Sequence, residues 1–195
     1  MRLCRFEQDG KAQAGFYFDT KIVSVAEAAR AVQAKSDLRA DLPDGDDLLP
    51  LLPHGKHHTN AKQVAVWLEK NQDVVGELAV KNAKLRTPLP HPNKLMLLAG
   101  NYAKHIEEGG GIAVARGKTF PYVFMKPAST ALNHPDASIS IPKVSPDHID
   151  WECELAFVIG KTAKGVKEAD ALKHVAGYTV VNDISDREFK PNPDR

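Results

Sequence analysis

Two glutamates separated by one residue, Glu152 and Glu154, are the side chains of this sequence best placed to do chemistry. They lead into an apolar run, residues 155–160, which has the length of a buried β-strand and ends at a glycine. Because side chains alternate along a strand, both carboxylates point to the same side, roughly 7 Å apart. Two anions at the edge of an apolar core repel each other and lose hydration, and a hard divalent cation with oxygen ligands would compensate both. The spacing alone is equally compatible with two solvated glutamates on an edge strand.

A third carboxylate, Asp183, follows a second strand-like run. Residues 177–181 read GYTVV, and Asn182 and Asp183 come directly after them. A short crossover helix is expected at residues 167–174, between the two runs, so we expect both strands to lie in one sheet. Three carboxylates with the remaining positions left to water are a typical arrangement for Mg²⁺. The third carboxylate therefore favours a metal site over a solvated edge.

The two carboxylate-bearing runs have companions upstream. The runs read DWECELAFVIG (150–160) and VAGYTVVNDISDR (175–187), and they are preceded by LAGNYAKHIEE (98–108) and PYVFMKP (121–127). In this order the four motifs resemble those of the fumarylacetoacetate hydrolase family, over about residues 92 to 190. Four ordered motifs make the resemblance specific.

The resemblance implies a metal site and some of its neighbours. It implies that Glu152, Glu154 and Asp183 bind Mg²⁺, Mn²⁺ or Ca²⁺. One departure bears on local substrate contacts: the family usually reads NDxSARD, whereas this chain has Asp186 and Glu188 at the variable positions.

A histidine and a glutamate in the first motif could activate water. Residues 102–108 read as a short helix stopped by three glycines, and on it His105 and Glu108 share a face. A carboxylate there can orient the imidazole and raise its basicity. By spacing alone, a surface helix with incidental polar residues explains the pattern at least as well. The glycines suggest a lid over residues 102–118 that can move, and the resemblance implies a catalytic histidine in this motif with a glutamate partner.

Two cations could hold the carboxylate of a substrate. Lys126 ends a strand expected at residues 123–125, and it could either neutralise a substrate or point to solvent. Arg187 could grip a carboxylate with two hydrogen bonds. The resemblance implies that an arginine at this place binds substrate.

The predicted fold class is α+β, mainly β. A small N-terminal α/β domain (1–86) is expected to hold a hairpin at Asp9-Gly10, a capping box from Ser24 to Glu27 and a second helix at 60–71. A proline-rich linker (87–92) follows it. Residues 93–195 are expected to form the first part of the family's mixed β-sandwich roll, incomplete at the C-terminus, and to begin with a fully buried strand at 95–99.

Composition excludes several classes of function. With 26 basic and 25 acidic residues, the chain has no charge imbalance that would favour a nucleic-acid or membrane surface. No apolar stretch approaches the roughly 20 residues of a membrane span, and no apolar signal region begins the sequence. The two cysteines, Cys4 and Cys153, are expected as reduced thiols, with Cys153 buried on the apolar side of its strand. We therefore expect a cytoplasmic protein.

The functional hypothesis is a divalent-metal-dependent hydrolase that cleaves a carbon–carbon bond of an acylpyruvate or β-diketo acid. A cation on the three carboxylates would act as a Lewis acid, and His105 would activate water. Related lyase, decarboxylase or isomerase chemistry on 2-oxo acids is the alternative. The resemblance also implies a longer catalytic domain, so an inactive truncated fragment that only folds or dimerises stays open. We expect a homodimer acting on small 2-oxo or β-diketo acids in aromatic catabolism.

Overall fold

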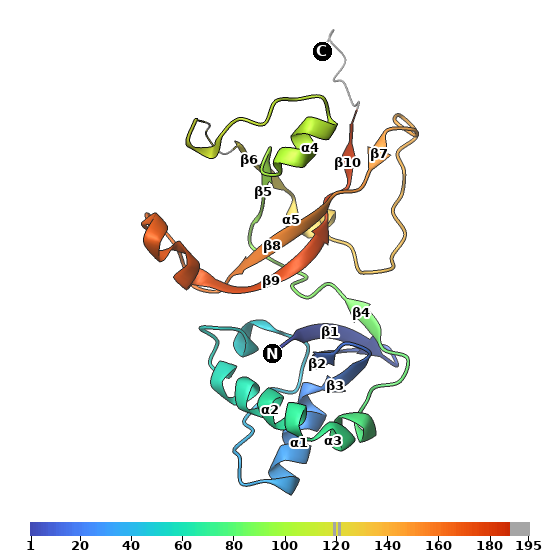
Figure 1. Cartoon of the computed structure of the whole chain (residues 1–195). Coiled ribbons are helices and arrows are strands. Elements are labelled where there is room, and N and C mark those ends of the chain that lie inside the picture. The colour runs from blue at the N-terminus through green and yellow to red at the C-terminus, as the bar shows by residue number, and fades with distance from the viewer. Residues whose placement is uncertain (119, 121, 188–195) are drawn as a thin grey trace. The chain divides into compact units, whose positions relative to one another are not determined.

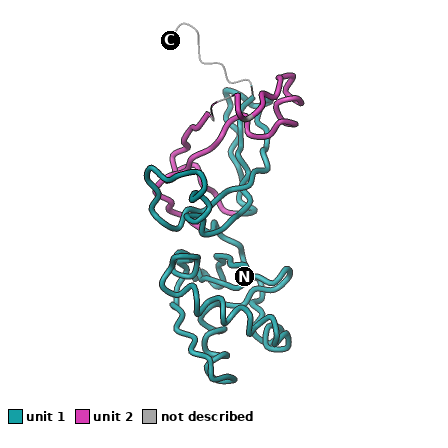
Figure 2. The backbone as a smooth tube through the Cα atoms, turned by 60° about the vertical axis from the view of Figure 1, so that its left-hand side comes forward, with its two compact units in different colours: residues 1–88, 135–195 teal, residues 89–134 magenta. Residues whose placement is uncertain are grey.

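The computed structural model of the chain describes residues 1–118, 120 and 122–187. It contains two compact units, residues 1–88 with 135–195 and residues 89–134, which Figure 2 colours separately. The division predicted from the sequence stays a prediction. Pro121 and Glu188, which the sequence motifs include, lie outside the described residues.

The N-terminal part is built on a four-stranded antiparallel sheet (Figure 1). Its strands are β1 (Leu3–Gln8), β2 (Lys11–Phe18), β3 (Lys21–Ser24) and β4 (Lys84–Arg86), in the order β3-β2-β1-β4. The turn between β1 and β2 is Asp9-Gly10, with φ of 51° and 77°. Positive φ at both positions is the type I′ geometry that matches the twist of a hairpin. The predicted hairpin is confirmed.

The helices of this part are α1 (Val25–Lys35), the 3₁₀ helix η1 (Leu49–Leu51), α2 (His58–Lys70) and α3 (Gln72–Glu77). With the sheet they enclose the main apolar core. Its largest fully buried side chains are Phe16, Val23, Val25, Val32, Leu51, Val64, Leu68 and Val75, and Phe6 packs with Cys4 and Ile22 in a second apolar cluster. The second predicted helix is confirmed.

The predicted capping box at the start of α1 is wrong. The Ser24 hydroxyl makes no cap bond and donates instead to Oε1 of Gln13, at 3.2 Å. Glu27 pairs with Arg30 on the next turn. Ser24 is buried beside β2, so a side-chain acceptor on the neighbouring strand competes with the helix terminus.

Unit 89–134 holds a strand pair and three short helices. Strand β5 (Leu95–Ala99) runs antiparallel to β6 (Tyr122–Lys126), and the helices are α4 (Ala103–Glu108), η2 (Arg116–Lys118) and α5 (Ala128–Ala131). The prediction of a fully buried strand at 95–99 is wrong, because only Leu97 is buried. Met96 and Leu98 project to the other, open side of the pair.

Residues 135–187 contain two further strand pairs. Strand β8 (Cys153–Ile159) runs antiparallel to β9 (Val175–Asn182), and they are joined through the 3₁₀ helix η3 (Glu168–His174). Strand β7 (Ile149–Asp150) pairs with β10 (Ser185–Asp186). The two runs that the sequence singled out are therefore neighbours in one sheet, as predicted.

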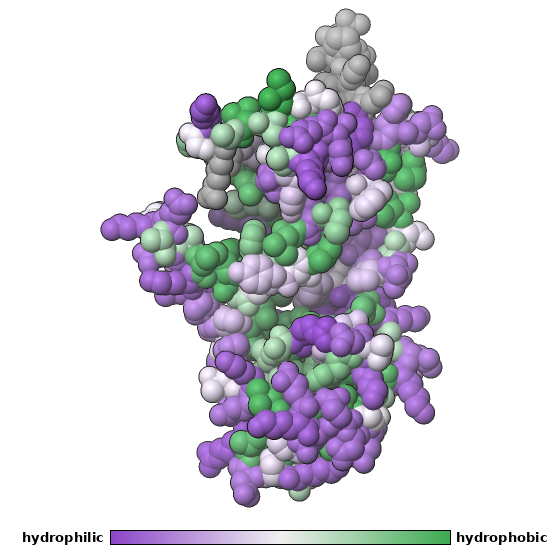
Figure 3. Space-filling view, in the orientation of Figure 1, coloured by the Kyte–Doolittle hydropathy of each residue, from purple (hydrophilic) through white to green (hydrophobic). Residues whose placement is uncertain are grey.

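One face of the β8–β9 pair is apolar and exposed. Leu155, Phe157 and Ile159 are 53%, 54% and 56% exposed. Tyr178 and Val180 lie opposite them, and Figure 3 shows hydrophobic surface over this region. The prediction of a buried strand with a buried Cys153 is thus wrong: Cys153 shares this face and is itself exposed.

The overall content is mixed α/β with mainly sheet, which agrees with the predicted class in its coarse form. Within the part of the chain that the structure describes, no helix combines the length and apolar character of a membrane span.

Candidate metal centre

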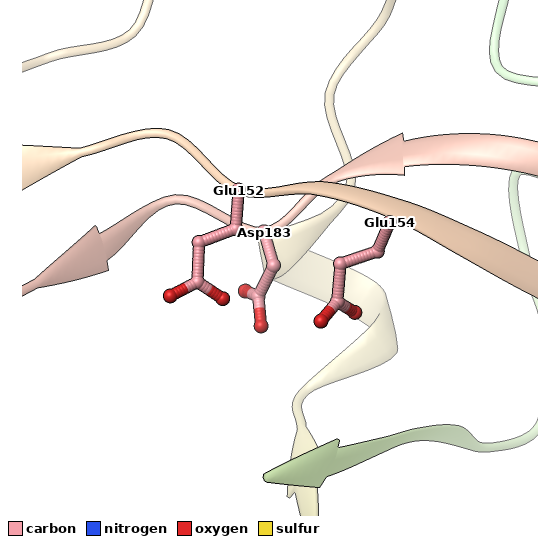
Figure 4. A group of neighbouring side chains, drawn as sticks. All are labelled: Glu152, Glu154 and Asp183. Atoms are coloured by element: carbon pink, nitrogen blue, oxygen red, sulfur yellow. The ribbon is translucent and has the colours of Figure 1, made fainter. Parts of the chain in front are cut away.

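The structure brings together the three carboxylates that the sequence singled out. One oxygen from each of Glu152, Glu154 and Asp183 lies within 4.8 Å of the other two. Figure 4 shows the three side chains leaving the two strands on the same side and ending next to one another. Asp183 is buried, with 5% of its surface exposed, and both glutamates are half-buried.

Backbone pairing produces this convergence. Glu154 lies opposite Val181 in the β8–β9 ladder, so Asp183 emerges beside Glu152, where β8 begins. The Asp183 N–H donates to the backbone oxygen of Glu152 at 2.8 Å. The Glu152 N–H donates in turn to Oδ1 of Asn182 at 3.0 Å. Sequence reasoning missed this role of Asn182, although its place next to Asp183 was a signal.

The donor set fits a hard divalent cation. Burying carboxylates close together is unfavourable unless a positive charge compensates them. Three carboxylate oxygens suit Mg²⁺, Mn²⁺ or Ca²⁺, whose further positions water or a substrate oxygen can fill. Among the described residues this is the one group of three or more metal-ligating side chains that converge in this way.

Arg187 contacts one of these three carboxylates, that of Glu152, and also the carboxylate of Asp150. Its Nε and Nη2 contact Oδ2 of Asp150 at 3.0 and 2.9 Å, and its Nη1 contacts Oε1 of Glu152. Partial burial lowers the pKa of the Arg187 guanidinium, but the two carboxylates more than offset this, so its pKa lies above the ordinary value. Sequence reasoning missed Asp150, and the predicted substrate-binding role of Arg187 stays a prediction.

The predicted His105–Glu108 pair lies on α4, in unit 89–134. The helix ends as predicted, and the glycines have a local reason: Gly110 takes a left-handed φ of 77°, and the N–H groups of Gly110 and Gly111 donate to the oxygens of Glu107 and Ile106. This is a Schellman cap. A glycine run that caps a helix does not by itself indicate a lid.

Lys126, the other residue of the predicted site that lies in unit 89–134, ends β6 and is half-buried. His105, Glu108 and Lys126 belong to a different compact unit from the three carboxylates. Their catalytic and substrate-binding roles therefore stay predictions.

The β8–β9 pair and the residues at its end present three convergent carboxylate oxygens, a donor set that suits a divalent cation. The family model described as "Fumarylacetoacetate (FAA) hydrolase C-terminal" matches residues 94–194. The chain belongs to the fumarylacetoacetate hydrolase family, as its four motifs predicted.

Curated relatives show the range of this family. The chain is 40% identical over 123 residues to oxaloacetate tautomerase fahd2, mitochondrial, of Xenopus laevis, covering 63% of this chain and 36% of that protein. It is 37% identical over 138 residues to oxaloacetate tautomerase YisK of Bacillus subtilis, covering 69% and 45%. It is 34% identical over 171 residues to a homoprotocatechuate catabolism bifunctional isomerase/decarboxylase of Escherichia coli, covering 85% and 38%. The chain thus spans less than half the length of these relatives.

Solved structures share the fold. Fumarylacetoacetate hydrolase from Exiguobacterium antarcticum matches with a TM-score of 0.61 at 23% identity, over 95% of this chain and 56% of that one. Maleylpyruvate hydrolase from Sphingobium sp. SYK-6, in complex with manganese(II) ion and pyruvate, matches with a TM-score of 0.60 at 23% identity, over 97% and 60%. At these identities the likeness concerns the fold alone.

Proposed function

We propose that this chain carries the metal centre of an enzyme that promotes enolisation of small 2-oxo acids. The observation that carries the proposal is the convergence of Glu152, Glu154 and Asp183 within 4.8 Å. A divalent cation held there supplies a Lewis acid that polarises the oxygens of a 2-oxo acid. The family membership supports an enzymatic role.

Residues of this chain would hold the cation, move a proton and bind the substrate. Glu152 and Asp183, joined by a backbone hydrogen bond, hold two ligand oxygens in a fixed relation, and Glu154 adds the third. His105, oriented by Glu108, would move the proton, either from a water or from the substrate carbon. Lys126 would neutralise a substrate carboxylate.

Two reactions follow from a common enolate. The first is hydrolysis of the carbon–carbon bond of an acylpyruvate or β-diketo acid, in which His105 activates water. The second is tautomerisation, isomerisation or decarboxylation of a 2-oxo acid without attack by water. A specific observation favours the second: curated relatives at 37–40% identity are named oxaloacetate tautomerases, whereas the hydrolases among the solved structures are only 23% identical.

The identity of the cation, the oligomeric state, the cellular location and the metabolic role are also proposals. We propose Mg²⁺, Mn²⁺ or Ca²⁺ as the bound ion, and the manganese in the maleylpyruvate hydrolase structure supports a divalent metal. A homodimer, a cytoplasmic location and a role in aromatic catabolism belong to the same proposal. The alternative, an inactive fragment that only folds or dimerises, predicts no turnover at all.

The test assays purified protein of verified mass with Mg²⁺ or Mn²⁺, following the enol of oxaloacetate and, separately, an acylpyruvate by ultraviolet absorbance. Metal-dependent turnover that is lost in Glu152→Gln, Glu154→Gln and Asp183→Asn is the expected result. Glu168→Gln, which removes an exposed carboxylate on η3, is the matched control and should keep its rate. Turnover that survives EDTA and all three substitutions would contradict the proposal.

A further inference from the structure

Asp150 and Arg187 lie beside the three carboxylates but are not among the proposed metal ligands. The β7–β10 pair sets Asp150 opposite Ser185, and the Arg187 N–H donates to the backbone oxygen of His148 at 2.9 Å. Backbone hydrogen bonds therefore join the end of the 175–187 motif to the start of the 150–160 motif. Because these bonds need no side chains, the placement of Arg187 near Glu152 does not depend on the ion pairs themselves.

The side chains form a chain of contacts that ends on a metal ligand. Both oxygens of Asp150 are engaged: Oδ1 accepts the Trp151 N–H at 2.9 Å, and Oδ2 accepts the Nε and Nη2 groups of Arg187. Asp150 thus fixes the plane of the guanidinium. The third guanidinium nitrogen, Nη1, contacts Oε1 of Glu152. A carboxylate has two oxygens, so one can take this contact while the other serves a cation.

We propose that Asp150 and Arg187 are positioning residues for the metal ligand Glu152: Asp150 orients the guanidinium, and the guanidinium orients the carboxylate toward the cation. The inference rests on the proposed metal centre and assigns Asp150 a role. It also changes the role expected for Arg187, whose guanidinium contacts Asp150 and Glu152.

Two effects of Arg187 on the cation oppose each other. Its positive charge repels a divalent ion, which would weaken binding. Its hold on Glu152 fixes a ligand in place before the ion arrives, and removing hydrogen-bond partners of ligands typically weakens metal binding 10–100-fold. Because Glu152 is half-buried and Asp150 already offsets the guanidinium charge, the positional effect dominates. Removal of either residue should weaken metal binding.

The experiment titrates the purified protein with Mn²⁺ alone and measures the concentration of free Mn²⁺ by electron paramagnetic resonance. Asp150→Asn keeps the shape of the side chain and removes its charge, and it should bind Mn²⁺ roughly 10–100-fold more weakly. Arg187→Gln should do the same, and the double variant should bind no more weakly than Arg187→Gln, because the two residues act in series. Arg187→Lys keeps the positive charge but lacks the planar guanidinium, so it should bind Mn²⁺ as weakly as Arg187→Gln does. Asp147→Asn, which removes an exposed carboxylate three residues before Asp150 in the sequence, is the matched control.

The outcomes separate the possible roles. Mn²⁺ binding by Asp150→Asn and Arg187→Gln that is as tight as in the wild type, or tighter, would overturn the inference. Substitutions that weaken only the binding of pyruvate would also overturn it, because Arg187 would then bind substrate. A purely structural role would lower the melting temperature in EDTA and leave Mn²⁺ affinity unchanged, and it too would overturn the inference. If Arg187→Gln fails to fold, Asp150→Asn decides alone. Failure of the wild type to bind Mn²⁺ would instead refute the proposed metal centre.

Discussion

Replacing Asp183 by asparagine should stabilise the metal-free protein and abolish its response to metal. The three ligand oxygens lie within 4.8 Å of one another, so each pair of charges repels by at least about 3.5 kcal/mol at an effective dielectric constant of about 20. Asp183 takes part in two such pairs. The positive charge of Arg187, which contacts Glu152, reduces the effect, and we expect a net gain of about 1–3 kcal/mol.

The assay is thermal unfolding followed by the fluorescence of Trp151, which adjoins the site, in a Trp67→Phe background that removes the other tryptophan. Metal at about 100 times its Kd should stabilise the parent by about 2.7 kcal/mol, a rise in Tm of roughly 5–11 °C. In EDTA, Asp183→Asn should melt above the parent, and added metal should leave its Tm unchanged. A variant that melts below the parent in EDTA, or still responds to metal, would refute the reasoning.

Three further predictions concern single residues elsewhere in the chain. Gly110→Ala should destabilise the unit that holds α4 by about 1–2 kcal/mol, measured by denaturant unfolding, because alanine is strained at a φ of 77°; an unchanged midpoint would contradict the Schellman cap. One thiol, the exposed Cys153, should react rapidly with Ellman's reagent, and Cys153→Ser should abolish that fast phase; two fast thiols would contradict the burial of Cys4. Burial raises the pKa of Cys4 from 9.0 to about 12, so between these values the unfolded state loses a proton that the folded state keeps. Stability should therefore fall by up to about 1.4 kcal/mol per pH unit above pH 9, and Cys4→Ala should flatten that part of the curve; equal slopes would contradict it.

Local and short-period features were predictable from the sequence. The Asp9-Gly10 turn follows from two residues that tolerate positive φ. The convergence of Glu152 and Glu154 follows from the period of two along a strand, and Asp183 joins them because its strand is the neighbour of theirs. Each of these needs only backbone geometry and strand adjacency.

Features that depend on long-range context were not predictable. An apolar run has the same sequence whether or not another element covers it, so the exposure of Leu155 and Cys153 had no local signal. Ser24 bonds to Gln13 and not to its own helix because a neighbouring strand offers an acceptor. The contact between Asp150 and Arg187 joins residues 37 positions apart and depends on the β7–β10 register.

We propose that Glu152, Glu154 and Asp183 together hold one divalent cation. Titration of the metal-free protein with Mn²⁺, followed by the paramagnetic resonance of the free ion, tests it most directly. We expect one site per chain in the wild type and in Glu168→Gln, and none in the triple variant Glu152→Gln, Glu154→Gln, Asp183→Asn. A wild type that binds no Mn²⁺, or a triple variant that binds it as the wild type does, would refute the shared metal site.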